Sequence, residues 1–220
     1  MTATVSSPST STNEEQRVVL YGISWGTYES LIADNPDQPF PRVTYDRGTM
    51  ELLVNASTEH EDTNRAISLL VDLVAAERGI DVRNVGSMLF KRADLGRGFE
   101  PDTCFYIQNE PHVRGAKQID PVLHPPPDLV IEIDVSRRSL NKLPVYAAFG
   151  VPEVWRVREG AVLVYTLRLD GSVRYDEGSP SRVLPPLDGE TLTRFLADGL
   201  AMGRAAWVRS VRTWAQSAAV

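Results

Sequence analysis

Two acids and a lysine stand at positions from which they could carry out hydrolysis. Asp102 opens an extended segment, Glu132 lies inside an apolar run, and Lys142 follows shortly afterwards. Carboxylate oxygens bind hard cations such as Mg²⁺, the cation polarises a phosphate and acidifies a water, and a lysine orients that water or offsets growing negative charge. This set is what metal-dependent hydrolysis of phosphodiesters needs. Because these residue types are common, the pattern also fits a surface turn, a strand end and a solvated lysine.

The run from Pro127 to Ser136 carries one of these acids and a second one beside it. The run is apolar and bounded by turn residues, which is typical of a strand buried on both faces. Glu132 and Asp134 stand two residues apart, so they lie on the same face of that strand. A buried carboxylate is costly unless a metal ion, a lysine or an arginine meets it. Taken alone, the run favours a simpler alternative, a strand end that has just reached solvent.

A further titratable group, Glu59-His60-Glu61, falls in the first turn of an expected helix. There His60 can lie at the mouth of a site and bond a phosphate or a metal-bound water, and either glutamate can reach a metal through water. A capping or surface histidine fits the composition equally well. Acids in a first turn are also favoured by the helix dipole alone.

The elements that must position these residues alternate between helices and strands. Apolar residues at three- and four-residue steps predict a helix from Thr58 to Arg78, which Gly79 ends. Hairpin signals surround Asp46-Arg47-Gly48 and Glu159-Gly160. Further helices are expected after Ser24, from Lys142 to Phe149, near Thr191 to Leu196 and from Gly203 to Ala218; further strands are expected at Ile80–Val85, Met88–Lys91, Thr103–Ile107, Asp128–Val135 and Ser172–Tyr175. We interpret Tyr146 and Trp155 as core aromatics. The order predicts an α/β domain with a mixed sheet.

Length and composition bound the function classes. The 220 residues suffice for one large domain, and we expect a disordered tail over 1–17, rich in Ser and Thr, before a single domain over 18–220. The single cysteine, Cys104, excludes an internal disulfide and fits a reducing cytoplasm, where we place the protein. No apolar run is long enough to span a bilayer, so no membrane association is expected. The net charge of −6 argues against a general nucleic-acid coat but permits local basic loops.

An ordered series of segments resembles the Uma-two family of restriction endonucleases, within the PD-(D/E)xK nuclease superfamily. The segments are Pro101-Asp102, Pro127–Asp134, Asn141–Tyr146 and Gly150–Trp155, with Tyr45–Leu52 and Glu59-His60-Glu61 resembling the family's opening. Together they span roughly Ser24 to Tyr165, and the ordered series is more specific than any one motif.

The resemblance implies a restriction-endonuclease-like fold, in which helices flank a mixed β-sheet that carries additional β-hairpins. It also implies Mg²⁺ or Mn²⁺ as cofactor and metal-dependent endonucleolytic hydrolysis of nucleic acid, with DNA the expected partner; a homodimer is left open. The implied metal ligands are Asp102, Glu132 and the backbone carbonyl of Ile133; the further catalytic residues are Lys142 and His60, supported by Glu59 and Asp134.

One position departs from the superfamily pattern. Asp134 stands where a lysine is expected two residues after the acid, so Lys142 must supply the positive charge from the next helix. Asp134 is then expected to pair with Lys142 or Arg137. If Lys142 cannot reach the acids, another function class remains: a catalytically degenerate nuclease fold that serves as a DNA-binding or protein-interaction module. Phosphate contacts would fall to basic loop residues, namely Lys91, Arg92, Arg97, Arg137 and Arg138.

Overall fold

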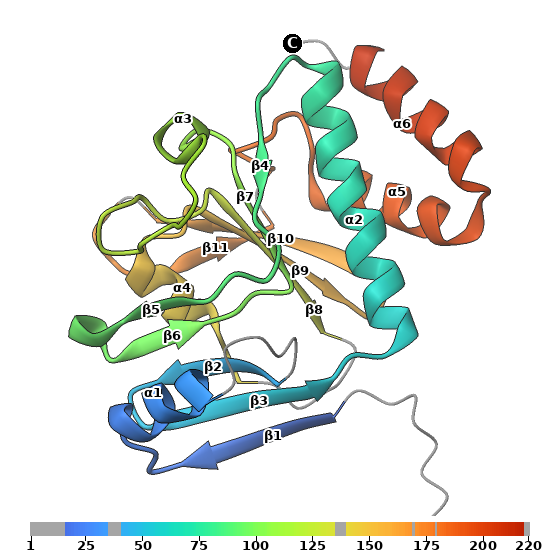
Figure 1. Ribbon diagram of the computed structural model, residues 1–220. Coiled ribbons are helices and arrows are strands. Elements are labelled where there is room, and N and C mark those ends of the chain that lie inside the picture. The colour runs from blue at the N-terminus through green and yellow to red at the C-terminus, as the bar shows by residue number, and fades with distance from the viewer. Residues whose placement is uncertain (1–15, 35–40, 135–139, 169, 179, 218–220) are drawn as a thin grey trace, which may run out of the picture.

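The strands form two sheets in a computed structural model that describes residues 16–34, 41–134, 140–168, 170–178 and 180–217 (Figure 1). The first sheet has the order β1 (Gln16–Tyr21), β3 (Thr49–Asn55), β2 (Arg42–Asp46), β6 (Arg97–Phe99) and β5 (Phe90–Arg92). The second has the order β11 (Tyr175–Glu177), β10 (Ala161–Leu167), β9 (Glu153–Arg158), β8 (Leu129–Asp134), β7 (Thr103–Tyr106) and β4 (Arg83–Asn84). In the second sheet β8 and β9 are parallel whereas β7 and β8 are antiparallel, so the mixed sheet predicted from the sequence is confirmed.

The hairpin of β2 and β3 is built by its turn residues. Asp46 pairs with Thr49, so Arg47 and Gly48 form a two-residue turn in which both φ angles are positive, at 46° and 100°. Two-residue turns of this kind match the twist of the flanking strands, and glycine adopts positive φ at little cost. Side chains alternate along β3, so Met50 packs with α1 (Trp25–Asp34) on one face while Glu51 points to the other.

The long helix α2 (Thr58–Glu77) is where the sequence predicts it. Ser57 caps its N-terminus, where the Oγ atom accepts a hydrogen bond from the backbone N–H of His60 at 3.1 Å. The helix ends at Glu77, Arg78 is its C-cap residue, and Gly79 follows with φ of 66°. The cap fixes which way the first turn faces, and thus where His60 and Glu61 lie.

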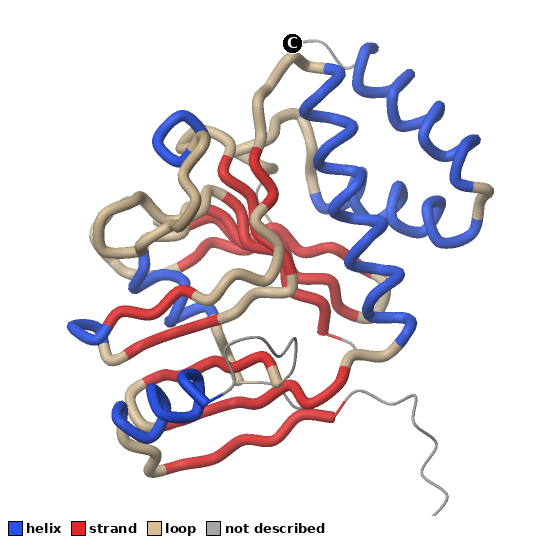
Figure 2. Tube along the Cα trace, viewed as in Figure 1, coloured by secondary structure: helices blue, strands red, loops and turns tan. Residues whose placement is uncertain are grey.

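Helices cover both faces of the second sheet (Figure 2). On one face α2 packs with α5 (Gly189–Ala201) and α6 (Arg204–Ser217) around a core that includes Leu70, Ile131 and Trp207. On the other face α4 (Leu143–Phe149) packs against β5 and β6. The short α3 (Glu110–Val113) lies in the connection between β7 and β8. The described residues contain no helix that is both long and apolar enough to cross a membrane.

Three features differ from the sequence-based expectation. Gln16 and Arg17, expected in the tail, begin β1, and residues 1–15 lie outside the described part of the chain. The strands form two sheets, where one was expected. The sequence also gave no sign of β6, because it is three residues long and has Gly98 at its centre. A Cβ atom at Gly98 would stand 2.1 Å from the Tyr28 Oη atom, so close packing excludes the side chain that would have marked a strand.

Candidate active site

Strand β7 begins at Thr103, so its pairing with β8 stops before Ile133. Thr103 pairs with Ile131 of β8, and next to this pair the Asp102 carboxylate takes the place that the backbone of a longer β7 would have. The Asp102 Oδ2 atom accepts a hydrogen bond from the Ile133 N–H at 2.7 Å. In an antiparallel pair, the N–H and the C=O of a hydrogen-bonded residue both point toward the same neighbouring strand. The Ile133 carbonyl therefore also points past the end of β7, next to Asp102.

The other carboxylate oxygen of Asp102 faces two basic groups. Its Oδ1 atom lies 2.5 Å from Arg42 Nη1 and 3.1 Å from His60 Nε2. Glu61 completes the group, with its Oε1 atom 3.5 Å from Arg42 Nη2 and 3.5 Å from His60 Nδ1. Burial alone would raise the pKa of the Asp102 carboxyl, but the hydrogen bond and charge of His60, with the charges of Lys142 and Arg42, hold that pKa well below its usual range. Asp102 is thus a buried anion.

Glu132 receives two donors from the start of α4. Lys142 Nζ lies 2.7 Å from its Oε2 atom, and the Tyr146 hydroxyl donates to its Oε1 atom. Burial raises the pKa of Glu132 more than the Lys142 charge lowers it, and nearby Asp102 raises it further. Burial would lower the pKa of Lys142, but attraction to Glu132 and then Glu51 outweighs it, so the Lys142 pKa is raised. Lys142 is therefore a buried cation held between two acids.

The first sheet adds a further acid, Glu51, and a second arginine, Arg17, to the site. The Glu51 Oε1 atom lies 3.1 Å from Arg17 Nη1 and 3.6 Å from Lys142 Nζ, and its Oε2 atom accepts the Leu140 N–H at 2.5 Å. Arg17 Nη2 donates to the Ile133 carbonyl oxygen at 3.3 Å. Both side chains of this ion pair are almost fully buried, with 3% of Arg17 and 2% of Glu51 exposed. Glu51 and Arg17 therefore join the two sheets at the site.

The structure brings together the residues that the resemblance implied, although their roles stay predictions. These residues are Asp102, Glu132, Lys142, His60 and the carbonyl of Ile133. Glu61 is the acid that faces His60, whereas Glu59 is exposed and lines a cavity of about 300 Å³ with Thr63, Ile133 and Asp134.

Asp134 and three of the basic loop residues have partners in the structure. Asp134 pairs with Arg156 of the neighbouring strand β9, a partner that the sequence did not indicate. Of its two expected partners, Lys142 bonds Glu132, and Arg137, like Arg138, lies outside the described residues. The other basic candidates already have acidic partners: Lys91 lies 3.3 Å from Glu29, Arg92 lies 2.5 Å from Asp94, and Arg97 lies 2.8 Å from Asp46. Phosphate contacts by these side chains would compete with those ion pairs.

Sequence reasoning did not select Arg17, Arg42, Glu51 or Tyr146. Arg42 alternates with apolar residues, which is also typical of a solvent-facing strand surface. Arg17 was expected in the tail, and Glu51 is one acid in an otherwise largely apolar strand, so neither position indicated a buried ion pair. Tyr146 did carry a signal, because it follows Lys142 by four residues and so lies on the same face of the α4 turn. Interpreting it only as a core aromatic was incomplete, since its ring is buried but its hydroxyl bonds Glu132.

The donor atoms suit a hard cation in type. Asp102, Glu132 and the Ile133 carbonyl offer only oxygen, and Mg²⁺ is commonly held by one or two carboxylates while keeping waters and substrate phosphate in its shell. Among the described residues no group of three or more His, Cys, Asp or Glu side chains is arranged to hold a metal. The available set is therefore two carboxylates and one carbonyl, each already bonded to a basic or hydroxyl group of the protein.

Comparisons with known proteins agree with this architecture. A crystal structure described as a "putative nuclease belonging to DUF820" from Anabaena variabilis matches with a TM-score of 0.52 and 16% sequence identity, over 79% of this chain and 99% of that one. At that identity the match shows the fold alone. The sequence matches none of the curated proteins. The Uma2 family profile, described as "Putative restriction endonuclease", matches residues 25–205, and so the chain belongs to that family.

Proposed function

We propose that the protein is a metal-dependent endonuclease that hydrolyses phosphodiester bonds in nucleic acid, with DNA as the substrate. The observation that carries this proposal is that, at the buried end of β8, the Asp102 carboxylate accepts the Ile133 N–H while Lys142 bonds the neighbouring Glu132. Their oxygen donors suit Mg²⁺ or Mn²⁺, and their lysine is buried and charged. Membership of a nuclease family supports the same reaction class.

Each residue has a role that follows from its contacts. Asp102, Glu132 and the Ile133 carbonyl would hold the divalent ion, which when bound would polarise the phosphate and lower the pKa of an attacking water. Lys142 places a fixed positive charge beside Glu132, where it can stabilise charge that grows on the phosphate. His60 fixes the orientation of the Asp102 carboxylate, and the Tyr146 hydroxyl does the same for Glu132.

A second function is favoured by one specific observation. The buried acids already face protein cations, so their charge is compensated within the chain. The pairs are Glu51 with Arg17, Asp102 with Arg42 and Glu132 with Lys142. A nuclease fold that no longer binds metal could keep such pairs for stability and serve as a nucleic-acid-binding module. The two functions differ in whether a divalent ion affects cleavage or binding of the nucleic acid.

The deciding experiment compares the wild type with Lys142→Met in a cleavage assay. Methionine keeps much of the lysine stem's bulk while removing the charge. We expect Lys142→Met to keep its circular dichroism spectrum and Mn²⁺ binding but to lose cleavage by on the order of 100-fold, as when one electrostatic stabiliser is removed elsewhere. Lys117→Met, which removes an exposed lysine, should cleave like the wild type.

The assay should contain supercoiled, linear and single-stranded DNA, an RNA, Mg²⁺ or Mn²⁺, and a chelator control. Calorimetry should show that Asp102→Asn and Glu132→Gln each weaken Mn²⁺ binding. A wild type that cleaves no substrate and binds DNA equally with and without metal would establish the binding module. Undiminished cleavage by Lys142→Met would leave the reaction standing but remove this residue from it.

A further inference from the structure

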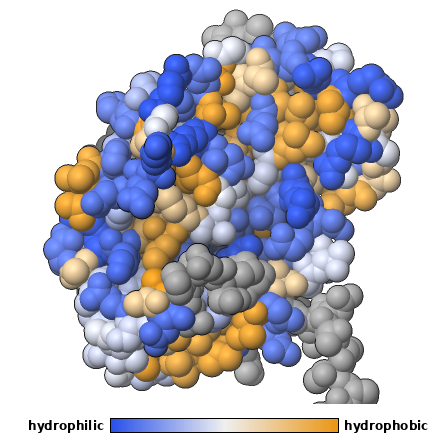
Figure 3. Space-filling model, viewed as in Figure 1, coloured by the Kyte–Doolittle hydropathy of each residue, from blue (hydrophilic) through white to orange (hydrophobic). Residues whose placement is uncertain are grey.

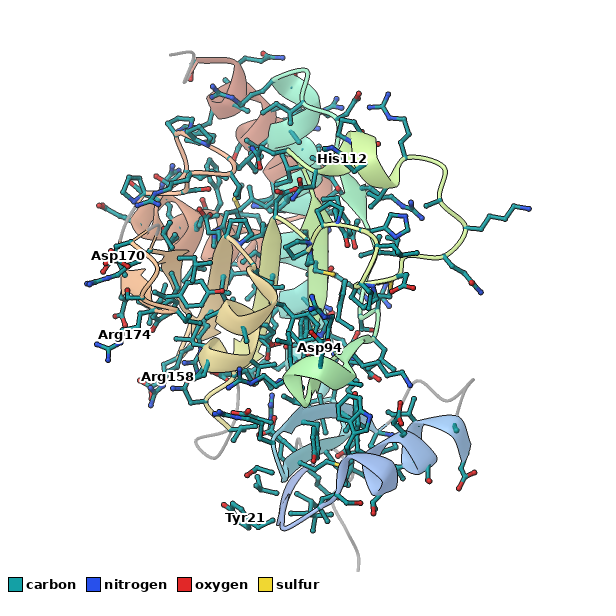
Figure 4. The ribbon with its side chains drawn as sticks, turned by 90° about the vertical axis from the view of Figure 1, so that its left-hand side faces the viewer. Tyr21, Asp94, His112, Arg158, Asp170 and Arg174 are labelled. Carbon is teal, nitrogen blue, oxygen red and sulfur yellow. The ribbon has the colours of Figure 1, made fainter. Side chains whose placement is uncertain are left out.

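Arg17 is an unusual residue for the strand that carries it. β1 lies at the edge of the first sheet and pairs only with β3, and its register shifts between Gln16 and Arg17. Exposed apolar side chains follow on the same strand, namely Val18, Leu20 and Tyr21. Figure 3 shows an apolar patch along the edge where β1 lies, and Figure 4 shows Tyr21 directed away from the protein. Although the strand lies at an exposed edge, only 3% of the Arg17 side chain is exposed.

The buried guanidinium bridges two groups that the site needs. Its Nη1 atom lies 3.1 Å from Glu51 and its Nη2 atom 3.3 Å from the carbonyl oxygen of Ile133. Two N–H groups in a rigid fork suit such a double contact. Burying an arginine is costly unless it is paired, so these two acceptors favour the buried position of Arg17.

The contact of Arg17 with Ile133 disfavours a second cation at the same oxygen. Magnesium lies about 2.0–2.1 Å from its oxygen ligands. An ion at that distance from the Ile133 carbonyl would stand beside the Arg17 guanidinium, and the two positive charges would repel in a buried site where screening is weak. Beside Glu132 and Lys142 the space is small, because the cavity that they line with Arg156 has a volume of about 10 Å³, room for one water at most. The larger cavity of about 300 Å³ that Ile133 lines opens toward Glu59 and Thr63.

The other two basic residues are anchored differently. Arg42 belongs to β2, which pairs with β3 on one side and β6 on the other, and Lys142 stands at the start of α4. Neither can leave without disturbing the core elements around it. Arg17 can leave when an edge strand loosens, because none of the three hydrophobic clusters of the described residues contains a side chain of β1.

We propose that Arg17 is an internal counter-ion that occupies the Ile133 carbonyl and Glu51, and that a divalent ion binds the site only as Arg17 withdraws. This inference rests on the proposed metal-dependent function. In this proposal β1 acts as a strap, a strand that closes the site. When β1 is in place, the site is neutral and closed; when β1 loosens, the oxygen donors are exposed.

The test measures Mn²⁺ affinity by titration calorimetry in the wild type, Arg17→Gln and a matched control. Removing the competing charge should tighten Mn²⁺ binding by on the order of tenfold or more. The control Arg47→Gln removes the same charge from an exposed position in the same sheet, where its partner is Asp46, and should leave the affinity unchanged. Circular dichroism and thermal melting verify that each variant folds.

Unchanged or weaker Mn²⁺ binding by folded Arg17→Gln would overturn the inference. If both proteins bind Mn²⁺ equally, the inference fails while the metal-dependent function stands; if neither binds Mn²⁺, both fail. If only Arg17→Gln binds, the inference is supported in its strongest form. Should Arg17→Gln not fold, hydrogen exchange of the wild type decides: saturating Mn²⁺ should speed exchange of the amides of Val18 and Leu20, and an unchanged rate would reject the strap.

Discussion

At the scale of single residues, the site is governed by the cost of buried charge. Three buried carboxylates of the site are each held by a basic side chain; the pairs are Glu51 with Arg17, Asp102 with Arg42 and Glu132 with Lys142. Removing one partner of such a pair leaves an uncompensated buried charge, which typically costs about 3–5 kcal/mol. An effect on function is therefore separated from an effect on folding best by a substitution that keeps the shape of the side chain and removes a hydroxyl group, leaving the buried charges in place.

Tyr146 offers such a substitution. Its ring packs edge-on against Phe99 at 4.8 Å between centroids, while its hydroxyl donates to Glu132. Tyr146→Phe keeps the ring and removes one donor, so we expect unfolding free energy to fall by about 1 kcal/mol and cleavage to fall roughly tenfold, because Glu132 loses the contact that orients it.

Tyr106→Phe is the matched control for this prediction. Tyr106 is also fully buried, and its hydroxyl donates to the Pro125 carbonyl at 3.1 Å, away from the acids. Urea unfolding should report a similar loss of stability in both variants, and the cleavage assay should report a loss only in Tyr146→Phe. Equal cleavage by the two variants would return Tyr146 to a purely structural role.

At the scale of elements, the starts of two helices present the basic groups to the acids on the strands. The first turn of α2 places His60 against Asp102, with Glu61 beside His60. At α4, the N-cap residue Lys142 and, four residues later, Tyr146 both reach Glu132. The direction of each turn depends on how its helix begins. Removal of a helix cap should therefore reduce cleavage by more than the accompanying loss of unfolding free energy suggests.

Ser57→Ala tests this at α2. The substitution removes the Oγ acceptor of the His60 N–H and should lower the free energy of unfolding by about 1 kcal/mol. It should also reduce cleavage severalfold, because the turn that holds His60 against Asp102 loosens. Ser57→Asn, another good capping residue, should restore both properties.

The control for Ser57→Ala is the corresponding change in another helix. Asp188 caps α5 through a hydrogen bond from the Thr191 N–H at 2.8 Å. Asp188→Ala should cost about as much stability, measured by urea unfolding, but leave cleavage at the wild-type rate. If both variants lose cleavage equally, general destabilisation explains the effect and the position of the α2 turn does not.

At the scale of the whole molecule, the site exists because two sheets meet. The first sheet supplies Arg17, Arg42 and Glu51, and the second supplies Asp102 and Glu132. The chain passes from one to the other between β6 and β7, where Glu100 is half-buried. Burial raises the pKa of Glu100 to about 7, against smaller lowering effects from a hydrogen bond with the Val43 backbone and the charges of Arg42 and Lys142.

This pKa predicts how stability depends on pH. A carboxyl whose folded pKa lies above its ordinary value of 4.5 stabilises the folded state fully below pH 4.5, and that contribution is lost as pH rises through about 7. Glu100→Gln removes the titration, so its stability relative to the wild type should rise by about 1–3 kcal/mol between pH 4.5 and pH 8.

Urea unfolding at several pH values, with a chelator present, measures this difference. Glu190→Gln removes an exposed carboxyl from α5 and should follow the wild type across the range. A Glu100→Gln variant whose relative stability stays constant with pH would show that Glu100 is ionised throughout, held by Arg42 and Lys142.

The sequence by itself determined the features that depend on neighbouring residues. The turn at Arg47-Gly48, the helix over 58–77 and the strand around Glu132 follow from local φ preferences, apolar spacing and turn residues. The ordered motifs also marked Asp102 and Lys142, which the fold places at the ends of a strand and a helix beside Glu132.

Only the tertiary structure decided which partners these residues meet. Asp134 binds Arg156 because β8 and β9 are parallel neighbours, a pairing that leaves no trace in either strand's own pattern. The local sequence around Glu51 does not indicate its partners: Arg17 comes from the neighbouring strand β1, and Lys142 and Leu140 come from the chain before α4. Contacts between residues far apart in the sequence determine how deeply a charged group is buried and which groups surround it, whereas the local sequence specifies only that the group is charged.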